Sequence, residues 1–154
     1  MDVEVTRDVE VVGDAMAAMD ALARNALPDE ACAILLGTSG ELAGDGAVRI
    51  EQIVPAANVH ASPCTHFEID PQALINAYRD GRSGGPAVLG YFHSHPNGPA
   101  RPSATDAEMA ARDGKIWAIW GSGADGNSDH NRDIRVFRSG EEGFEALSLR
   151  VIES

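Results

Sequence analysis

Hydrophobic and polar positions follow two different periods along the chain, and these periods predict interleaved strands and helices. Short runs rich in β-branched or aromatic residues and bounded by Gly or Pro are typical of strands, whereas apolar residues three or four positions apart indicate helices. Strands are predicted at residues 3–12, 33–36, 47–54, 88–93, 115–120, 134–138 and 144–151. Helices are predicted from residue 14 to just before Pro28, at 71–82 and at 103–113. This order favours an α/β or α+β class, with a central mixed sheet flanked by helices.

Glycine and proline residues set the expected boundaries of several elements. We expect Gly37 to stop the second strand, Pro55 to end the third, and Gly114 to end the last helix. Residues 139–143 are typical of a hairpin turn between the two final strands. The buried face of the helix at 71–82 is predicted to contain Leu74, Ile75 and Tyr78.

A net charge of −12 over 154 residues narrows the range of partners. This charge repels phosphate backbones and anionic membranes, and the basic residues are scattered singly, so neither nucleic acid nor membrane is an expected partner. The length predicts one domain over residues 1–154. The two cysteines form no Cys-x-x-Cys pair, and the N-terminus lacks the basic and apolar regions of a signal peptide. We therefore expect a cytoplasmic protein. The sequence does not indicate its oligomeric state.

Two histidines in the strand that ends near residue 95 form half of a predicted metal site. Side chains alternate between the faces of a strand, so His93 and His95 point the same way and Ser94 points away as a supporting residue. The proline-rich segment at 96–102 must turn, which can bring Asp106 back beside the histidines. Two imidazoles and one carboxylate leave one tetrahedral position open for water, as in catalytic zinc sites.

The same segment also has the pattern of a helix N-terminus. Ser103 with an acidic residue three positions later resembles a capping box, in which the side chain of Ser103 would cap the helix and Asp106 would lie in the first turn. The two interpretations are compatible, because a cap fixes the direction of Asp106 and an ordered carboxylate is a better ligand.

The histidines, Ser103 and Asp106 together resemble the sequence signature of a known family. The spacing His93-x-His95, seven residues, Ser103, two residues, Asp106 resembles the signature of the JAMM (JAB1/MPN+) metalloproteases, and every position is filled. The family places a catalytic Glu in a segment similar to Pro-x-Glu-x-Cys-Gly-x-Leu-Leu-Gly. Residues 28–37 resemble that segment, with Ala where the family usually has Gly.

The resemblance covers most of residues 28–120, including Asn58, 67–71 and 85–90, and is nearest to the small single-domain bacterial members. It implies a JAB/MPN fold, similar to the three-layer deaminase arrangement. It also implies a Zn²⁺ ion held by His93, His95 and Asp106. Glu30 would act as the general base and acid, and the hydroxyl of Ser103 would stabilise the oxyanion. Without the resemblance, Glu30 would be interpreted as an ordinary solvated acid near a helix end.

The resemblance further implies a substrate. Members of this family cleave the peptide or isopeptide bond that follows the C-terminal Gly-Gly of a ubiquitin-like or sulfur-carrier protein, and a narrow channel over the metal would admit Gly and exclude larger side chains. The loop after residue 56 would hold the extended tail by strand addition. The bond could join a modifier to a target lysine, or a sulfur carrier to a newly made cysteine.

Three rival functions follow from related patterns. A zinc nucleobase deaminase requires His-x-Glu together with Pro-Cys-x-x-Cys, and the sequence lacks Pro-Cys-x-x-Cys. A non-catalytic MPN scaffold would not need the metal and catalytic residues, all of which are present. JAB proteins associated with DNA repair usually have His-Asn-His in place of His93-Ser94-His95.

Two polar segments offered further sites. Cys64-x-His66 has the spacing of a second metal half-site or a nucleophile pair, but the sequence shows no partner for it. Residues 121–131 are rich in Asp and Asn, yet their spacing does not match an EF-hand, so a mobile insertion is expected there.

Overall fold

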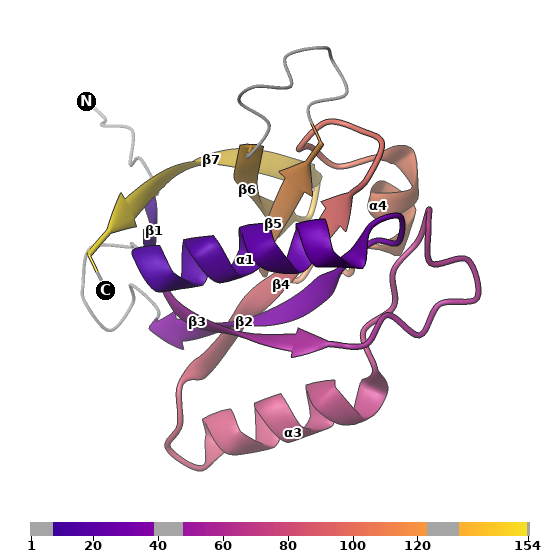
Figure 1. Ribbon diagram of the computed structural model, residues 1–154. Coiled ribbons are helices and arrows are strands. Elements are labelled where there is room, and N and C mark those ends of the chain that lie inside the picture. The colour runs from indigo at the N-terminus through magenta and orange to yellow at the C-terminus, as the bar shows by residue number, and fades with distance from the viewer. Residues whose placement is uncertain (1–7, 39–47, 123–132, 154) are drawn as a thin grey trace.

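The structure, a computed structural model, describes residues 8–38, 48–122 and 133–153, and within them it contains seven strands and three helices (Figure 1). In chain order the elements are β1 (Asp8–Val12), α1 (Gly13–Ala26), β2 (Cys32–Thr38), β3 (Val48–Ala56), α3 (Pro71–Arg82), β4 (Ala87–His95), α4 (Ala104–Met109), β5 (Ile116–Gly121), β6 (Asp133–Gly140) and β7 (Gly143–Ile152). The predicted mixed class, with a sheet and helices that interleave along the chain, is confirmed.

The sheet curls round until its two ends meet. Its strand order is β1-β3-β2-β4-β5-β6-β7, and it closes because β1 pairs in parallel with both β3 and β7. In Figure 1, β7 arches over the top of the sheet to reach β1. β4 and β5 are also parallel, whereas the pairs β2–β3, β2–β4, β5–β6 and β6–β7 are antiparallel. The central mixed sheet is therefore present, but it is closed rather than open.

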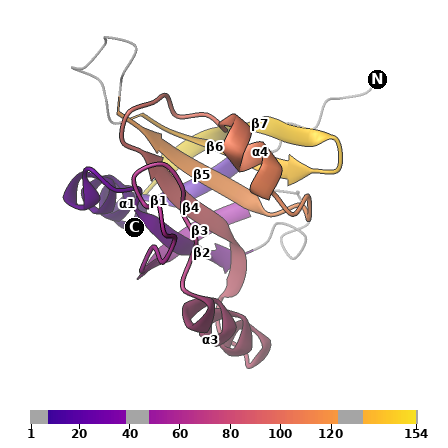
Figure 2. The ribbon, with the colours of Figure 1, turned by 90° about the vertical axis from the view of Figure 1, so that its right-hand side faces the viewer.

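The two faces of the sheet carry separate hydrophobic clusters, as the alternation of side chains along a strand requires. Along β2, Ala33 and Leu35 join the cluster that packs against α1, whereas Ile34 and Leu36 join the cluster that packs against α3. Figures 1 and 2 show α1 and α3 on different sides of the strands. Met19, which has no exposed surface, lies at the centre of the α1 face.

Two strand boundaries differ from the prediction. β2 continues through Gly37, where its pairing with β3 shifts register. A Cβ on this residue would lie 1.9 Å from the carbonyl oxygen of Arg49, so glycine is used for close approach and not as a stop. Pro55 also lies within a strand, paired with Ala33. On its other edge β3 pairs with β1 only at Val48–Ile50. No strand pairs with Pro55 on that edge, so the N–H group that proline lacks is not required for pairing there.

Two predictions about helices were also wrong in detail. α4 ends at Met109, well before Gly114, because the backbone N–H groups of Arg112 and Gly114 bond to Ser139 of β6 instead of continuing the helix. In α3, which has the predicted bounds, the side chain of Ile75 is 56% exposed and Ala77 is buried in its place. Of the predicted strand at residues 3–12, residues 8–12 form β1, whereas residues 3–7 lie outside the described residues, as does nearly all of the segment at 121–131.

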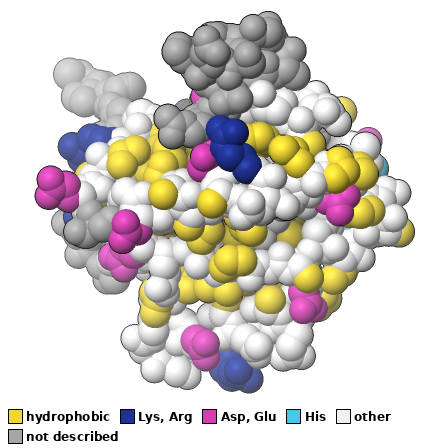
Figure 3. Space-filling model, in the orientation of Figure 1, with side chains coloured by type: hydrophobic (Ala, Val, Ile, Leu, Met, Phe, Trp, Pro, Cys, Tyr) yellow, Lys and Arg dark blue, Asp and Glu magenta, His cyan; other side chains and the backbone are white. Residues whose placement is uncertain are grey.

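The surface carries isolated charges. On the face drawn in Figure 3, Lys and Arg side chains stand apart from one another, with acidic groups and patches of hydrophobic side chains between them. None of the helices in residues 8–38, 48–122 and 133–153 has the length and hydropathy needed to cross a bilayer.

Candidate metal centre

The two histidines of β4 lie on the same face of the sheet, as the alternation predicted, and this face also carries α3. His93 stands opposite Cys32 in the neighbouring strand, and both are fully buried. Ser94 points to the other face, where its Oγ accepts the backbone N–H of Ala31 at 2.8 Å. The N–H of Ser94 donates in turn to the carbonyl of Ala31. Ser94 therefore joins the end of β4 to the segment just after Glu30, which agrees with a supporting role.

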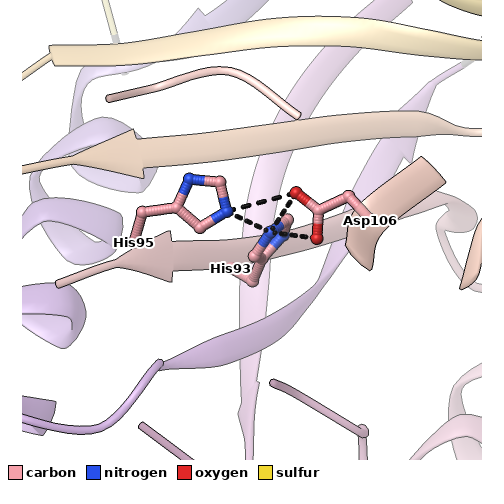
Figure 4. Close-up of side chains that lie close together, drawn as sticks. All are labelled: His93, His95 and Asp106. Carbon is pink, nitrogen blue, oxygen red and sulfur yellow. Dashed lines mark hydrogen bonds and ion pairs between the residues drawn. The ribbon is translucent and has the colours of Figure 1, made fainter. Parts of the chain in front are cut away.

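The short helix α4 fixes the carboxylate. The Oγ of Ser103 accepts the N–H of Asp106 at 3.0 Å, and the Oδ2 of Asp106 accepts the N–H of Ser103 at 2.9 Å. This reciprocal pair is a complete capping box. Asp106 is nevertheless 3% exposed and faces the histidines (Figure 4), so the observed capping box is compatible with a ligand role for its carboxylate.

The three side chains converge on one point (Figure 4). The Nε2 atoms of His93 and His95 are 3.1 Å apart, and they lie 3.2 and 3.1 Å from the Oδ2 of Asp106. Ligand atoms about 2.0–2.2 Å from a tetrahedral zinc ion lie roughly 3.3–3.6 Å from one another. The observed triangle is close to that size. Among the residues that the structure describes, no other group of three His, Cys, Asp or Glu side chains is arranged to hold a metal ion.

The two histidines have different surroundings outside the triangle. The Nδ1 of His95 lies 2.9 Å from the carbonyl oxygen of Pro99, which can only accept, so Nδ1 carries a proton and Nε2 offers a lone pair in the neutral ring. The ring of His93 is stacked on Phe67 at 4.2 Å and meets the edge of Trp117 at 5.5 Å. Its Nδ1 has no partner among the described residues.

The electrostatics of the triangle suit a divalent cation. Burial lowers the pKa of His93 and outweighs the opposing effect of Asp106. Burial alone would raise the pKa of Asp106, but hydrogen bonds with both histidines and with the N–H of Ser103 lower it well below its usual range. Burial opposes protonation of His95, yet its bonds to Asp106 and Pro99 raise its pKa. A buried carboxylate with two imidazoles fits zinc or a related transition metal.

Glu30 lies beside the triangle without joining it. It is 6% exposed and, among the described residues, its carboxylate makes no hydrogen bond. Burial raises its pKa to about 7, while His95 lowers it and Asp106 raises it further. Glu30, His95 and Ser103 line the same surface cavity of about 350 Å³. A carboxylate with a pKa near neutrality can both accept and release a proton.

Asn58 positions Glu30 and was noted in the sequence only as part of the resemblance. Its Nδ2 donates to the carbonyls of Glu30 and His66, each at 3.0 Å, and its Oδ1 accepts the N–H groups of His60 and Glu68. The backbone N–H of Glu30 donates to Pro63 in the same loop. The bonds that reach Glu30 from Asn58 and Pro63 join residues far apart in sequence, so no local pattern reveals them.

Replacement of Asn58 by Ala is expected to lower the free energy of unfolding by about 1–3 kcal/mol, because it leaves partly buried backbone groups without partners. Chemical denaturation of the metal-free protein measures the effect. Asn76→Ala, which removes an amide on the surface of α3, is the control and should change stability by no more than about 0.5 kcal/mol. Equal stability of the two variants would show that the Asn58 network carries no stabilising energy.

The structure offers no support for a second site at Cys64. Its thiol donates to the carboxylate of Asp29 at 3.3 Å, and this bond raises the pKa of the thiol, which opposes a nucleophilic role. The ring of His66 stacks on that of His60 at 4.5 Å, and its Nδ1 lies 2.8 Å from the hydroxyl of Thr65.

Comparisons with known proteins agree with this geometry. The sequence matches the profile of prokaryotic homologues of the JAB domain over residues 13–138. It is 42% identical over 65 residues to a probable TtuB-protein conjugate cleaving protease of Thermus thermophilus, covering 42% of this chain and 44% of that protein. It is 37% identical over 81 residues to a desampylase of Haloferax volcanii, covering 52% and 58%. These matches span about half the length of either relative.

A longer match and two solved structures complete the comparison. A CysO-cysteine peptidase of Mycobacterium tuberculosis is 28% identical over 125 residues, which covers 81% of this chain and 78% of that protein. A protein from Desulfitobacterium hafniense has a TM-score of 0.78 and 32% identity, over 95% of this chain and 94% of its own. A JAB1/MPN domain protein from Archaeoglobus fulgidus has the same fold, with a TM-score of 0.59 and 22% identity over 94% and 99%.

The predicted resemblance to the JAB1/MPN+ family is thus confirmed. Because the profile matches residues 13–138, from the start of α1 to near the end of β6, the chain belongs to the prokaryotic homologues of the JAB domain.

Proposed function

We propose that this protein is a zinc-dependent hydrolase that cleaves the peptide or isopeptide bond following the C-terminal Gly-Gly of a ubiquitin-like or sulfur-carrier protein. The observation that carries the proposal is the buried triangle of His93, His95 and Asp106 with Glu30 in the adjoining cavity. We also propose one domain over residues 1–154 and a cytoplasmic location.

Glu30 would carry out the proton transfers of the cleavage reaction. A zinc ion held by the three ligands would act as a Lewis acid toward the scissile carbonyl and the attacking water. The carboxylate of Glu30 would accept a proton from that water and deliver it to the leaving nitrogen. Its low exposure and a pKa raised to about 7 support both halves of this role, because the group changes state easily near neutral pH.

Ser103 would stabilise the oxyanion that forms on the scissile carbonyl. Its Oγ accepts the N–H of Asp106, which leaves the hydroxyl hydrogen free to donate into the cavity that it lines with His95. The capping box restricts the rotation of this side chain, so the donor is held in position before the substrate binds.

The substrate class rests on the named relatives. They include a protease that cleaves TtuB-protein conjugates, a desampylase and a CysO-cysteine peptidase. The first name describes cleavage of a protein conjugate, and the third describes a peptidase that acts on CysO-cysteine. The exposed loop that contains Cys64 and Thr65 borders the same cavity as Glu30, which supports a route by which an extended tail enters.

A panel of ubiquitin-like and sulfur-carrier proteins, each extended beyond its Gly-Gly terminus, tests the proposal. Mass spectrometry of the products should show one cut after the second Gly, and a chelator should abolish it. Asp106→Asn is the control for contaminating proteases, because it lacks the anionic ligand. Bound zinc without cleavage of any substrate would instead favour a scaffold for a ubiquitin-like pathway.

A further inference from the structure

An unpaired arginine stands at the rim of the cavity that contains Glu30 and His95. Arg101 is the only Lys or Arg among the residues that line this cavity. Six other described arginines have a carboxylate within 4.0 Å, but the guanidinium of Arg101 has no ion pair or hydrogen bond with the described residues. In a protein with a net charge of −12, an exposed cation beside the proposed active site and without an acidic partner is available for a ligand.

The backbone that carries Arg101 is held firmly. Its N–H donates to the carbonyl of Pro99 at 2.9 Å, and the same oxygen accepts from the ring of His95. The neighbouring Ala100 is 4% exposed and packs closely on Gly121. A Cβ added to Gly121 would lie 2.3 Å from the backbone nitrogen of Ala100. The start of the side chain is therefore fixed relative to the metal ligands, and only the side chain itself can reorient.

The chemistry of the substrate indicates what this guanidinium would bind. A Gly-Gly tail carries no side-chain charge, and neither does the bond to be cleaved. A single amino acid attached after Gly-Gly has its α-carboxylate next to the scissile nitrogen, whereas a lysine within a target protein presents no carboxylate at that place. Arginine binds carboxylates with two parallel hydrogen bonds. It would therefore discriminate between a single amino acid and the lysine of a target protein as the leaving group.

We propose that Arg101 is a specificity-determining residue that binds the free α-carboxylate of a single amino acid in the leaving-group position. The protein would then prefer sulfur-carrier or ubiquitin-like proteins that bear one terminal amino acid after Gly-Gly over those joined to a lysine side chain. This inference rests on the proposed function.

Two substrates test the inference. Both are the same Gly-Gly-terminated carrier extended by one cysteine, which ends in a free carboxylate in one substrate and in an amide in the other. The wild-type protein should cleave the acid with a kcat/KM on the order of ten- to a hundredfold higher, as expected for a charged hydrogen-bonded pair. Arg101→Ala should bring that ratio close to one, mainly through the KM of the acid, and Arg101→Lys should give an intermediate ratio.

The control is Arg82→Ala, which removes another exposed arginine without an ion pair among the described residues, at the end of α3 and away from the cavity. It should keep the wild-type ratio. A ratio of one for the wild type, or an unchanged ratio for Arg101→Ala, would overturn the role of Arg101 and leave the proposed function standing. Chelator-sensitive cleavage of neither substrate would overturn the role of Arg101, and failure on the whole panel of carriers as well would overturn the proposed function.

Discussion

Glu30→Gln is expected to lower the rate of cleavage by about 10²- to 10⁴-fold while the protein keeps its metal. The amide has nearly the shape of the carboxylate but cannot accept the proton of the attacking water. Glu30 is not one of the three convergent ligands, so metal content should not change. The matched control is Glu108→Gln, which changes an exposed acid on α4. Turnover at the wild-type rate in Glu30→Gln would remove Glu30 from the mechanism.

The same substitution should stabilise the metal-free protein at alkaline pH. Burial raises the pKa of Glu30 from 4.5 to about 7, so ionisation of this group favours the unfolded chain. The cost is absent below pH 4.5, grows as the pH rises toward 7, and is complete above it, at roughly 3 kcal/mol or less. Denaturation at pH 8 should therefore show Glu30→Gln to be more stable than the wild type, and at pH 4 the difference should vanish. An equal difference at both values would contradict the assignment.

Replacement of His95 by Ala is expected to weaken metal binding more than about 100-fold and to abolish cleavage. Loss of a residue that only supports a ligand typically lowers affinity 10- to 100-fold, and His95 supplies a ligand atom itself. Isothermal titration with zinc measures the affinity. His66→Ala removes a histidine outside the triangle and should bind zinc as the wild type does. Unchanged binding by His95→Ala would show that the metal lies elsewhere.

The arrangement of the candidate metal ligands was predictable because each part depends on a local pattern. The alternation of a strand places His93 and His95 on one face, and a capping pattern fixes Asp106 in the first turn of α4. Both patterns span only a few residues. The helix α3 was also predicted with its full bounds, because Pro71 and the apolar spacing mark it locally.

Features that depend on neighbours distant in sequence could not be predicted. Gly37 and Pro55 look like strand ends, yet both lie inside strands. Gly37 is needed because a carbonyl of the adjoining strand β3 comes too close for a side chain. Pro55 is tolerated because β1, on the other side of β3, does not pair with it. The parallel pairing of β1 with β7 closes the sheet through residues near opposite ends of the chain. The bonds of Asn58 and the cavity beside Arg101 likewise join separate segments.

The central claim is that His93, His95 and Asp106 hold the metal ion on which cleavage depends. The most direct measurement is cleavage of a Gly-Gly-terminated carrier by protein that has been stripped with a chelator and then titrated with Zn²⁺. We predict that the stripped protein is inactive and that activity returns in full at about one equivalent of zinc per chain, as three ligands with an open position imply. Full activity in the stripped protein, or cleavage that His95→Ala retains at the same zinc concentration, would contradict the account.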